Sequence, residues 1–254
     1  MADKARILFT GLNSAFFNMG LDEAILESVA AGSCPPTLRF YGWTPSAISL
    51  GYFQGIHEEV DTQACREKGV DIVRRITGGG AVFHDTEVTY SIVIPEGHRL
   101  APDSITDSYA ILCAGIVEGL AILGVGSEFV PINDIVSAGR KISGNAQTRK
   151  KGCLLQHGTI LLDVDVEKMF SLLMVPKEKA KGKLIEDVKA RVGSLSAILG
   201  RPVGFTETAS ALEEGFVSAL GLDPVREEPK EEELALAHRL AEEKFSRRWW
   251  VHKR

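Results

Sequence analysis

The sequence has few cysteines, and their spacing suggests neither a metal site nor a disulfide framework. Four of the 254 residues are cysteines, at Cys34, Cys65, Cys113 and Cys153. None of them forms a C-x-x-C pair or a cysteine–histidine spacing of the zinc type. Scattered thiols of this kind indicate a reducing environment, so we expect a cytoplasmic protein.

The sequence also lacks an excess of positive charge and long apolar runs. The formal net charge is -5, whereas nucleic-acid binders and proteins of the membrane surface are more often basic. The N-terminal stretch MADKARILFTG has no signal-peptide core, and no later run reaches the roughly 18 apolar residues of a spanning helix. We therefore expect neither nucleic acid nor a membrane as a partner.

The pattern of apolar residues predicts a domain of mixed secondary structure. Helices are predicted over 16–32, 61–69, 103–124, 206–220 and 231–245, with a further helix starting near Asp165. Strands are predicted over 37–43, 47–53, 71–75, 80–84, 88–95 and 153–165, with a hairpin over 134–143 that turns at Ala138–Gly139. This order favours an α+β fold with a mixed, mainly antiparallel sheet flanked by helices.

The stretch RRITGGGAVFHD, residues 74–85, is a candidate for anion binding. It is no Walker A loop, because Gly80 is followed by Ala-Val-Phe, and no dinucleotide fingerprint, because it leads into a strand and not a helix. Consecutive glycines allow backbone N–H groups to face an anion, and Arg74 and Arg75 could clamp a phosphate or carboxylate. A glycine-rich turn with two solvated arginines fits the same pattern.

Two further positions carry polar groups on predicted strands. Lys141 precedes Gly144, and His157–Gly158 interrupts the apolar stretch LLQHGTILL. A polar pair inside an apolar strand needs a hydrogen-bond partner or a function. Taken singly, a solvated lysine and a hydrogen-bonded core histidine explain them equally well.

Taken together and in order, these motifs resemble those of the lipoate–protein ligase A and lipoyl/octanoyl transferase family. The matching stretches are NMGLDEAI, LRFYGW, SLGYFQ, RRITGGGAVFHD, NDIVSAGRKISGNAQ, HGTILL and VGSLS, within about residues 13–200. The resemblance implies the fold of the biotin/lipoyl protein ligase catalytic domain. It implies a single domain over 1–254, with a core of about 13–222, a charged linker and last helix over 223–254, and no C-terminal accessory domain.

The resemblance also implies a chemistry and the residues that carry it. A ligase of this family condenses lipoate with ATP to an acyl-adenylate and passes the acyl group to a lysine of a lipoyl domain. Lys141 would bridge the acyl carbonyl and the phosphate as the catalytic cation, and Asp134 would bind Mg²⁺. The residues expected to bind ATP and the acyl-adenylate are Arg75, Gly78, Gly79, Gly80, Ala81, Val82, Phe83, His84, Asn133, Asp134, Lys141 and His157. Aromatic residues such as Phe40, Tyr41 or Phe53 could line the acyl slot.

Three departures from the family pattern leave the reaction open. The sequence contains no accessory domain, so a separate small protein could supply it. The text HDTEVTYS after the glycines is closer to single-domain octanoyltransferases than to ligases. Those transferases work through a cysteine thioester, yet neither GVGSEFVPINDIVSAG nor MVPKEKA contains a cysteine where the family has one. Cys153 is the remaining candidate nucleophile, and a buried, unreactive thiol is the expected alternative.

From these features we expect an ATP-dependent lipoate (or octanoate) ligase. The alternative is an octanoyltransferase that takes octanoyl from acyl carrier protein. A third possibility is a non-catalytic subunit that binds lipoyl domains. In each case the expected partner is a lipoyl-domain protein, either the glycine-cleavage H protein or a 2-oxoacid dehydrogenase E2.

Overall fold

The computed structural model describes the backbone of residues 3–174 and 178–254, and the side chains of 3–174 and 185–254. Its centre is an eight-stranded sheet with the order β11-β1-β2-β6-β10-β9-β8-β7. The strands are β1 (Asp3–Asn13), β2 (Thr37–Trp43), β6 (Glu87–Pro95), β7 (Glu128–Val130), β8 (Asp134–Ser137), β9 (Arg140–Lys150), β10 (Cys153–Leu161) and β11 (Leu222–Arg226). β1 pairs in parallel with β2 and β11, and the other pairs are antiparallel. The predicted mixed, mainly antiparallel sheet is confirmed.

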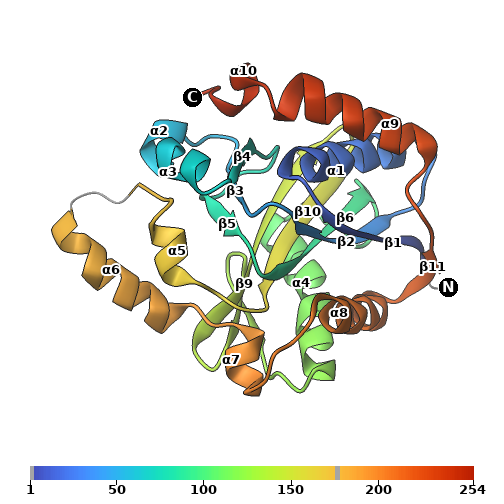
Figure 1. Cartoon of the computed structure of the whole chain (residues 1–254). Helices are drawn as coiled ribbons and strands as arrows, with labels where there is room; N and C mark the ends of the chain where they lie inside the picture. Colours follow the sequence, from blue (N-terminus) through green and yellow to red (C-terminus); the bar gives the residue numbers. More distant parts are fainter. Residues whose placement is uncertain (1–2, 175–177) are drawn as a thin grey trace.

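A second, smaller sheet has the order β4-β3-β5 and comprises β3 (Ala47–Leu50), β4 (Asp71–Arg74) and β5 (Val82–His84). The glycines of RRITGGGAVFHD connect β4 to β5. We call residues 77–81 the glycine loop. The short helices α2 (Ile56–Glu59) and α3 (Thr62–Glu67) lead from β3 back to β4. The small sheet lies beside the large one in Figure 1 and places the glycine loop next to β9 and β10.

Helices cover both faces of the large sheet (Figure 1). α4 (Ile105–Ile122) and α8 (Phe205–Leu220) pack together on one face, where Leu112, Ile116 and Phe216 are fully buried in the larger core cluster. α1 (Ala15–Ala30) and α9 (Glu231–Leu240) pack on the other, followed by the π-helical turn η1 (Ala241–Phe245) and α10 (Arg248–Val251). α5 (Val166–Phe170), α6 (Glu178–Arg191) and α7 (Leu195–Leu199) connect β10 to α8.

Local sequence signals explain several boundaries. Ser14 caps α1 by accepting a hydrogen bond from the Phe17 N–H, and Asp61 caps α3 as predicted. Ala138 and Gly139 both have positive φ, 48° and 75°, which is the conformation of a tight hairpin turn between β8 and β9. The predicted hairpin and its turn are confirmed.

The large sheet extends past residues 13–222, the stretch predicted as the core, at both ends. β1 contributes the fully buried Ile7 and Leu8 to the sheet, and β11 pairs with it from Leu222 to Arg226. The linker therefore begins after Arg226. β11 escaped detection because Leu222 is its sole buried residue, so it has no apolar alternation. The short helix α10 was not predicted either.

α4 corrects one detail of the sequence analysis. The helix is long and apolar enough by length and composition to cross a membrane, contrary to the expectation that no such run exists. Ile105, in its first turn, is 60% exposed. Tyr109, Leu112 and Leu120 are buried, and the helix packs against α8 and the sheet as a core helix of the domain.

Candidate active site

A pocket of about 390 Å³ lies between the small sheet and one face of the large sheet. The glycine loop and β5 line one side, β6, β9 and β10 line the other, and α1 contributes Met19. The predicted site residues that line it are Arg75, Gly79, Gly80, Ala81, Val82, Phe83, His84, Asn133, Lys141 and His157. The lining residues run from Met19 to Val192, so segments far apart in sequence meet at one cavity.

The glycine loop presents unused backbone donors to this pocket. Gly79 and Gly80 are exposed, and Gly79 has a φ of +95°, which favours glycine. The N–H groups of Gly78, Gly79 and Gly80 donate to no described protein atom. The loop also passes so close to β3 that a Cβ on Gly51 would lie 1.9 Å from the Gly79 carbonyl oxygen. Its shape is therefore fixed by backbone contact.

Arg75 fixes the conformation of the glycine loop through hydrogen bonds to two of its carbonyl oxygens. Its guanidinium donates to the carbonyls of Gly78 (2.8 Å) and Gly80 (2.7 Å), to Ser49 and to the Thr77 hydroxyl. These contacts use its N–H groups, so in this conformation Arg75 shapes the loop. The sequence analysis had suggested instead that Arg75 clamps a ligand. None of its partners is a carboxylate, and burial lowers the pKa of Arg75 to about 10. Its contribution to the pocket is a buried positive charge.

Arg74 points away from the pocket. It is fully buried and donates to five carbonyl oxygens, those of Gly51, Tyr52, Gln54, Trp250 and Val251. The Trp250 indole N–H donates in return to the Arg74 carbonyl oxygen. Arg74 therefore ties α10 to the end of β3, and no carboxylate pairs with it among the described side chains.

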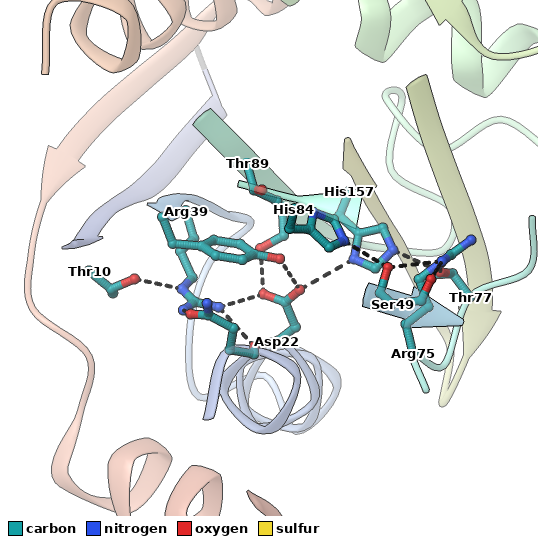
Figure 2. A network of polar contacts seen from close by, with 12 residues as sticks. Thr10, Asp22, Arg39, Ser49, Arg75, Thr77, His84, Thr89 and His157 are labelled. Carbon is teal, nitrogen blue, oxygen red and sulfur yellow. Dashed lines mark hydrogen bonds and ion pairs between the residues drawn. The ribbon is translucent and has the colours of Figure 1, made fainter. Parts of the chain in front are cut away.

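A buried network joins His157 to α1 (Figure 2). The His157 ring lies 2.7 Å from the Thr77 hydroxyl through Nε2 and 3.4 Å from Asp22 Oδ2 through Nδ1. Burial lowers the pKa of His157, although the Asp22 carboxylate counteracts it. Burial would raise the pKa of Asp22, but hydrogen bonding with His157 and the charge of Arg39 outweigh that effect and lower it. The network therefore favours a neutral His157 beside an ionised Asp22.

His84 belongs to a second polar chain. Its Nδ1 lies 2.6 Å from Glu87 Oε1, its Nε2 lies 2.7 Å from the Ser49 hydroxyl, and its ring stacks on Trp43 with centroids 4.0 Å apart. Ser49 also accepts a hydrogen bond from Arg75 (3.0 Å). Figure 2 shows Ser49 between His84 and Arg75. His84 and Arg75 are thereby held in fixed orientations on the same side of the pocket.

Lys141 lines a less enclosed side of the pocket, and its partner Asp134 lies just outside the lining residues. Lys141 Nζ lies 2.6 Å from Asp134 Oδ1, and the side chains are 43% and 34% exposed. Asp134 Oδ1 lacks a partner with hydrogen-bond angles, so the contact is an ion pair that is easily exchanged. Gly144 makes room for the lysine, because a Cβ there would lie 2.9 Å from Lys141 Nζ. Asn133 and Asn145 bind each other's main chain at the turn before β8.

The remaining predicted residues lie elsewhere. Cys153 is buried in the core beneath α1, and all four cysteines are buried and absent from the described pocket lining. Tyr41 lines the pocket as suggested, but Phe40 is in the core with Phe216, and Phe53 is 66% exposed outside the pocket. Gly78 lies in the glycine loop just outside the lining residues.

The sequence analysis missed several residues of the site. Asp22, Ser49, Thr77 and Glu87 connect the predicted side chains, and Trp43 stacks on one of them. A buried carboxylate in the middle of an apolar helix was the available signal for Asp22. Ser49 gave no comparable signal, because a serine within a short strand is common.

Comparison with known proteins shows the family of this chain. The family described as lipoyl protein ligase A/B catalytic domain matches residues 14–217. The chain belongs to this family. Octanoyltransferase LipM of Kyrpidia tusciae is 40% identical over 94% of this chain and 97% of the relative. The relatives found by sequence thus bear the name of the alternative function, and not that of the ligase.

Solved structures of lipoate ligases are similar throughout the lipoyl protein ligase A/B domain. A bipartite lipoate protein ligase of Thermoplasma acidophilum has 30% identity and a TM-score of 0.89 over 98% of this chain and 96% of its own. A lipoate-protein ligase A solved with bound ATP has 29% identity and a TM-score of 0.83 over 99% of both chains. The expected fold and family are confirmed, and the chain is an enzyme of the ligase/transferase family.

Proposed function

We propose that this protein transfers lipoate or octanoate to the lysine of a lipoyl-domain protein, after activating the acid with ATP. The observation that carries the proposal is that the described pocket offers backbone donors for an anion but is lined by no cysteine. Among the described residues the glycine-loop N–H groups have no protein acceptor, and the buried Arg75 at the base of the loop has no carboxylate partner. Such a site suits phosphate oxygens.

Two steps follow from this arrangement. The acid's carboxylate oxygen attacks the α-phosphorus of ATP, pyrophosphate leaves, and an acyl-adenylate forms. The deprotonated amine of the acceptor lysine then attacks the acyl carbon, the bond to AMP breaks, and an amide forms. Lys141 lines the pocket and would exchange Asp134 for the developing oxyanion or the phosphate, and a positive charge there would lower the barrier.

The lack of a thiol in the pocket argues against a thioester intermediate. Each of the four cysteines is buried, and burial raises the pKa of Cys153, which disfavours the nucleophilic thiolate. The acyl group would then pass directly from its activated donor to the acceptor lysine. His157 and Arg75 would position the donor from the enclosed side of the pocket.

Mg²⁺ fits this site as a companion of the nucleotide. The described residues contain no cluster of three metal-ligating side chains, and Asp134 already contacts Lys141. Mg²⁺ commonly uses one or two carboxylates together with substrate phosphates. Asp134 is the residue that would hold it, and the ion would neutralise phosphate charge.

Octanoyl transfer from acyl carrier protein is the second candidate, favoured by the names of the curated relatives. Without a pocket thiol, the lysine amine would attack the octanoyl thioester directly and release the carrier thiol. A non-catalytic lipoyl-domain binder is less well supported, because Arg75, the glycine loop and Lys141 all meet at the pocket. The cytoplasmic location, the acceptor (H protein or E2) and a separate accessory protein remain parts of this proposal.

The deciding experiment offers both donors to one enzyme. Purified protein is incubated with an apo lipoyl domain and either octanoate, ATP and Mg²⁺ or octanoyl carrier protein, and the intact mass of the domain is measured. We expect the octanoyl mass gain with octanoate and ATP, with release of pyrophosphate. A gain from the carrier protein alone, unaffected by ATP, would reject the ligase in favour of the transferase.

A further inference from the structure

Outside the pocket, a group of cations surrounds two aromatic rings, of which Tyr52 is half-buried and Phe53 is exposed. We call Tyr52, Phe53, Lys150, Lys253 and Arg254 the basic–aromatic patch. Lys253 Nζ and Lys150 Nζ lie 4.2 Å and 5.0 Å from the Tyr52 ring centroid, and the Arg254 guanidinium carbon lies 5.6 Å from that of Phe53. These three cations come from β9 and from the end of the described chain, and they converge on the loop after β3.

The charge of this patch is not neutralised by the protein. Among the described side chains, no carboxylate oxygen lies within 4.0 Å of Lys150, Lys253 or Arg254. Some lysines elsewhere on the surface are paired, such as Lys151 with Glu27 at 2.7 Å. The pKa of the Tyr52 hydroxyl is lowered, first by its hydrogen bond with Lys253 and then by the surrounding cations. A local positive field thus exists on a chain of net charge -5.

The patch also exposes an apolar surface. Phe53 is 66% exposed, and its ring packs edge-on against Tyr52 with centroids 5.0 Å apart. Tyr52 packs in turn against the buried Trp250, which fixes the loop to α10. Aromatic rings and arginine are enriched in protein–protein interfaces, where a rigid ring loses little conformational freedom on binding.

The patch is continuous with the glycine loop. The Tyr52 N–H donates to the Thr77 carbonyl oxygen at 2.9 Å, and Gly51 lies against Gly79. Lys150 lies four residues along β9 from Ala146, which lines the pocket. At about 3.4 Å per residue, that is a separation of about 14 Å, well within the width of a small protein domain. A domain whose lysine enters the pocket would therefore reach the patch.

We propose that the basic–aromatic patch docks an acidic face of the lipoyl-domain acceptor while the acceptor lysine enters the pocket. This proposal rests on the proposed function, which requires a protein acceptor at this pocket. Unpaired cations select carboxylates, and Phe53 adds an apolar anchor. The negative net charge and the small number of cations favour a protein over RNA as the occupant.

The test compares a variant with two reversed charges in the patch with a control variant that has two reversed charges elsewhere on the surface. Lys150→Glu/Lys253→Glu is the test variant. Lys4→Glu/Arg239→Glu carries the same charge change at exposed positions of β1 and α9, which likewise have no ion-pair partner within 4.0 Å among the described side chains. We expect the KM for the lipoyl domain to rise at least about tenfold in the test variant, with kcat within about twofold. The control should match the wild type, and high salt should reduce the difference.

Two further measurements separate this proposal from the proposed function. Acyl-adenylate formation from octanoate and ATP involves no acceptor, so the test variant should form it at the wild-type rate. Binding of a lipoyl domain whose acceptor lysine is replaced by arginine reports docking even if ATP-dependent acylation fails. Unchanged KM and binding would overturn the proposal. The proposal would also be overturned if the test variant lost only its binding of octanoyl carrier protein or of a single-stranded RNA oligonucleotide, because either result would identify a different occupant.

Discussion

The molecule buries four arginines in two different ways. Arg6 donates to both oxygens of Glu233, at 2.6 and 2.8 Å, and Arg39 donates to Asp22 at 2.8 Å. Arg74 and Arg75 are equally buried but bind carbonyl and hydroxyl oxygens, with no carboxylate partner among the described side chains. Burial alone would lower the pKa of Arg6, but the hydrogen bond and charge of Glu233 raise it. Burial lowers the pKa of Arg75.

Of the two arginines without a carboxylate partner, Arg74 has a structural role and points away from the pocket, whereas the charge of Arg75 lies at the glycine loop and is left for a ligand. A buried charge is costly unless it is paired, so the fold supplies counter-charges for Arg6 and Arg39. Beside the glycine loop the counter-charge is missing, and the neighbouring N–H groups are free as well. We infer that an anionic substrate supplies the missing negative charge there. Four experiments test this difference between the arginines, and a fifth tests the role of the buried thiols.

The largest expected effect is on stability, from removing the carboxylate of a paired arginine. Asp22→Asn and Glu233→Gln should each lower the free energy of unfolding by about 3–5 kcal/mol, because each leaves an uncompensated buried arginine. Urea denaturation measures both. Only Asp22→Asn should also lower turnover, since Asp22 contacts His157 and Glu233 lies outside the pocket lining. A loss under about 1 kcal/mol in either variant would contradict the assigned structural role.

The next effect concerns the half-exposed cation of the pocket. Lys141→Ala should reduce kcat by about 100- to 1000-fold, because it removes a charge that stabilises the transition state. Its thermal stability should stay at the wild-type level, since the side chain is 43% exposed. Lys168→Ala is a matched control, because Lys168 is 35% exposed and ion-paired with Asp85 at 3.0 Å. Near-normal turnover of Lys141→Ala would remove this lysine from the mechanism.

The unpaired charge of Arg75 predicts stabilisation by a polyanion. Pyrophosphate should raise the melting temperature more than sodium chloride of equal ionic strength. At a pyrophosphate concentration of 100 times its Kd, the free energy of unfolding should rise by about 2.7 kcal/mol. Arg75→Lys should abolish this shift, because a lysine cannot hold Gly78 and Gly80 together. Arg6→Lys should lower stability but keep the shift. Equal shifts in both variants would show that the anion binds elsewhere.

A smaller effect, restricted to mildly acidic pH, follows from His157 and Asp22. Both groups have a lowered pKa in the folded protein. The unfolded chain then binds more protons, so their stabilisation is present above the unfolded pKa and is lost as pH falls through the folded pKa. The free energy of unfolding should decrease as pH falls below the ordinary histidine pKa of 6.5. In His157→Gln this dependence should flatten between about pH 7 and pH 5.5. The titration of Asp22 at lower pH should change as well, because its pKa is lowered partly by the hydrogen bond with His157.

The sequence predicted those parts of the structure that local chemistry determines. The hairpin turn at Ala138–Gly139, the Asp61 cap and the strand β2 depend on neighbouring residues, and all three were located correctly. The ordered motifs identified the family. By contrast, β11 is an edge strand with one buried residue, and it forms because β1 offers a partner 220 residues away. No local pattern carries that information.

The site shows the same division. The glycine loop, Lys141 and His157 were found from the sequence, but the direction of Arg74 and the saturation of Arg75 by protein oxygens were not. Two consecutive arginines on a strand must point to opposite faces, yet which one faces the pocket depends on how β4 packs. Asp22, Ser49 and Glu87 act through contacts between segments that only the fold brings together.

The smallest expected effect concerns Cys153, the candidate nucleophile of a thioester route. Cys153→Ser should retain most of the wild-type turnover, because Cys153 is 1% exposed in the core and outside the pocket lining. Cys65→Ser, equally buried in another cluster, is the control and should behave alike. Both variants lose some stability, since a buried hydroxyl needs a partner. A folded but inactive Cys153→Ser, together with an octanoyl mass gain on the wild-type protein that this variant lacks, would instead establish a thioester route. In that case the unpaired charge of Arg75 would have to serve an anionic group of another acyl donor and not ATP.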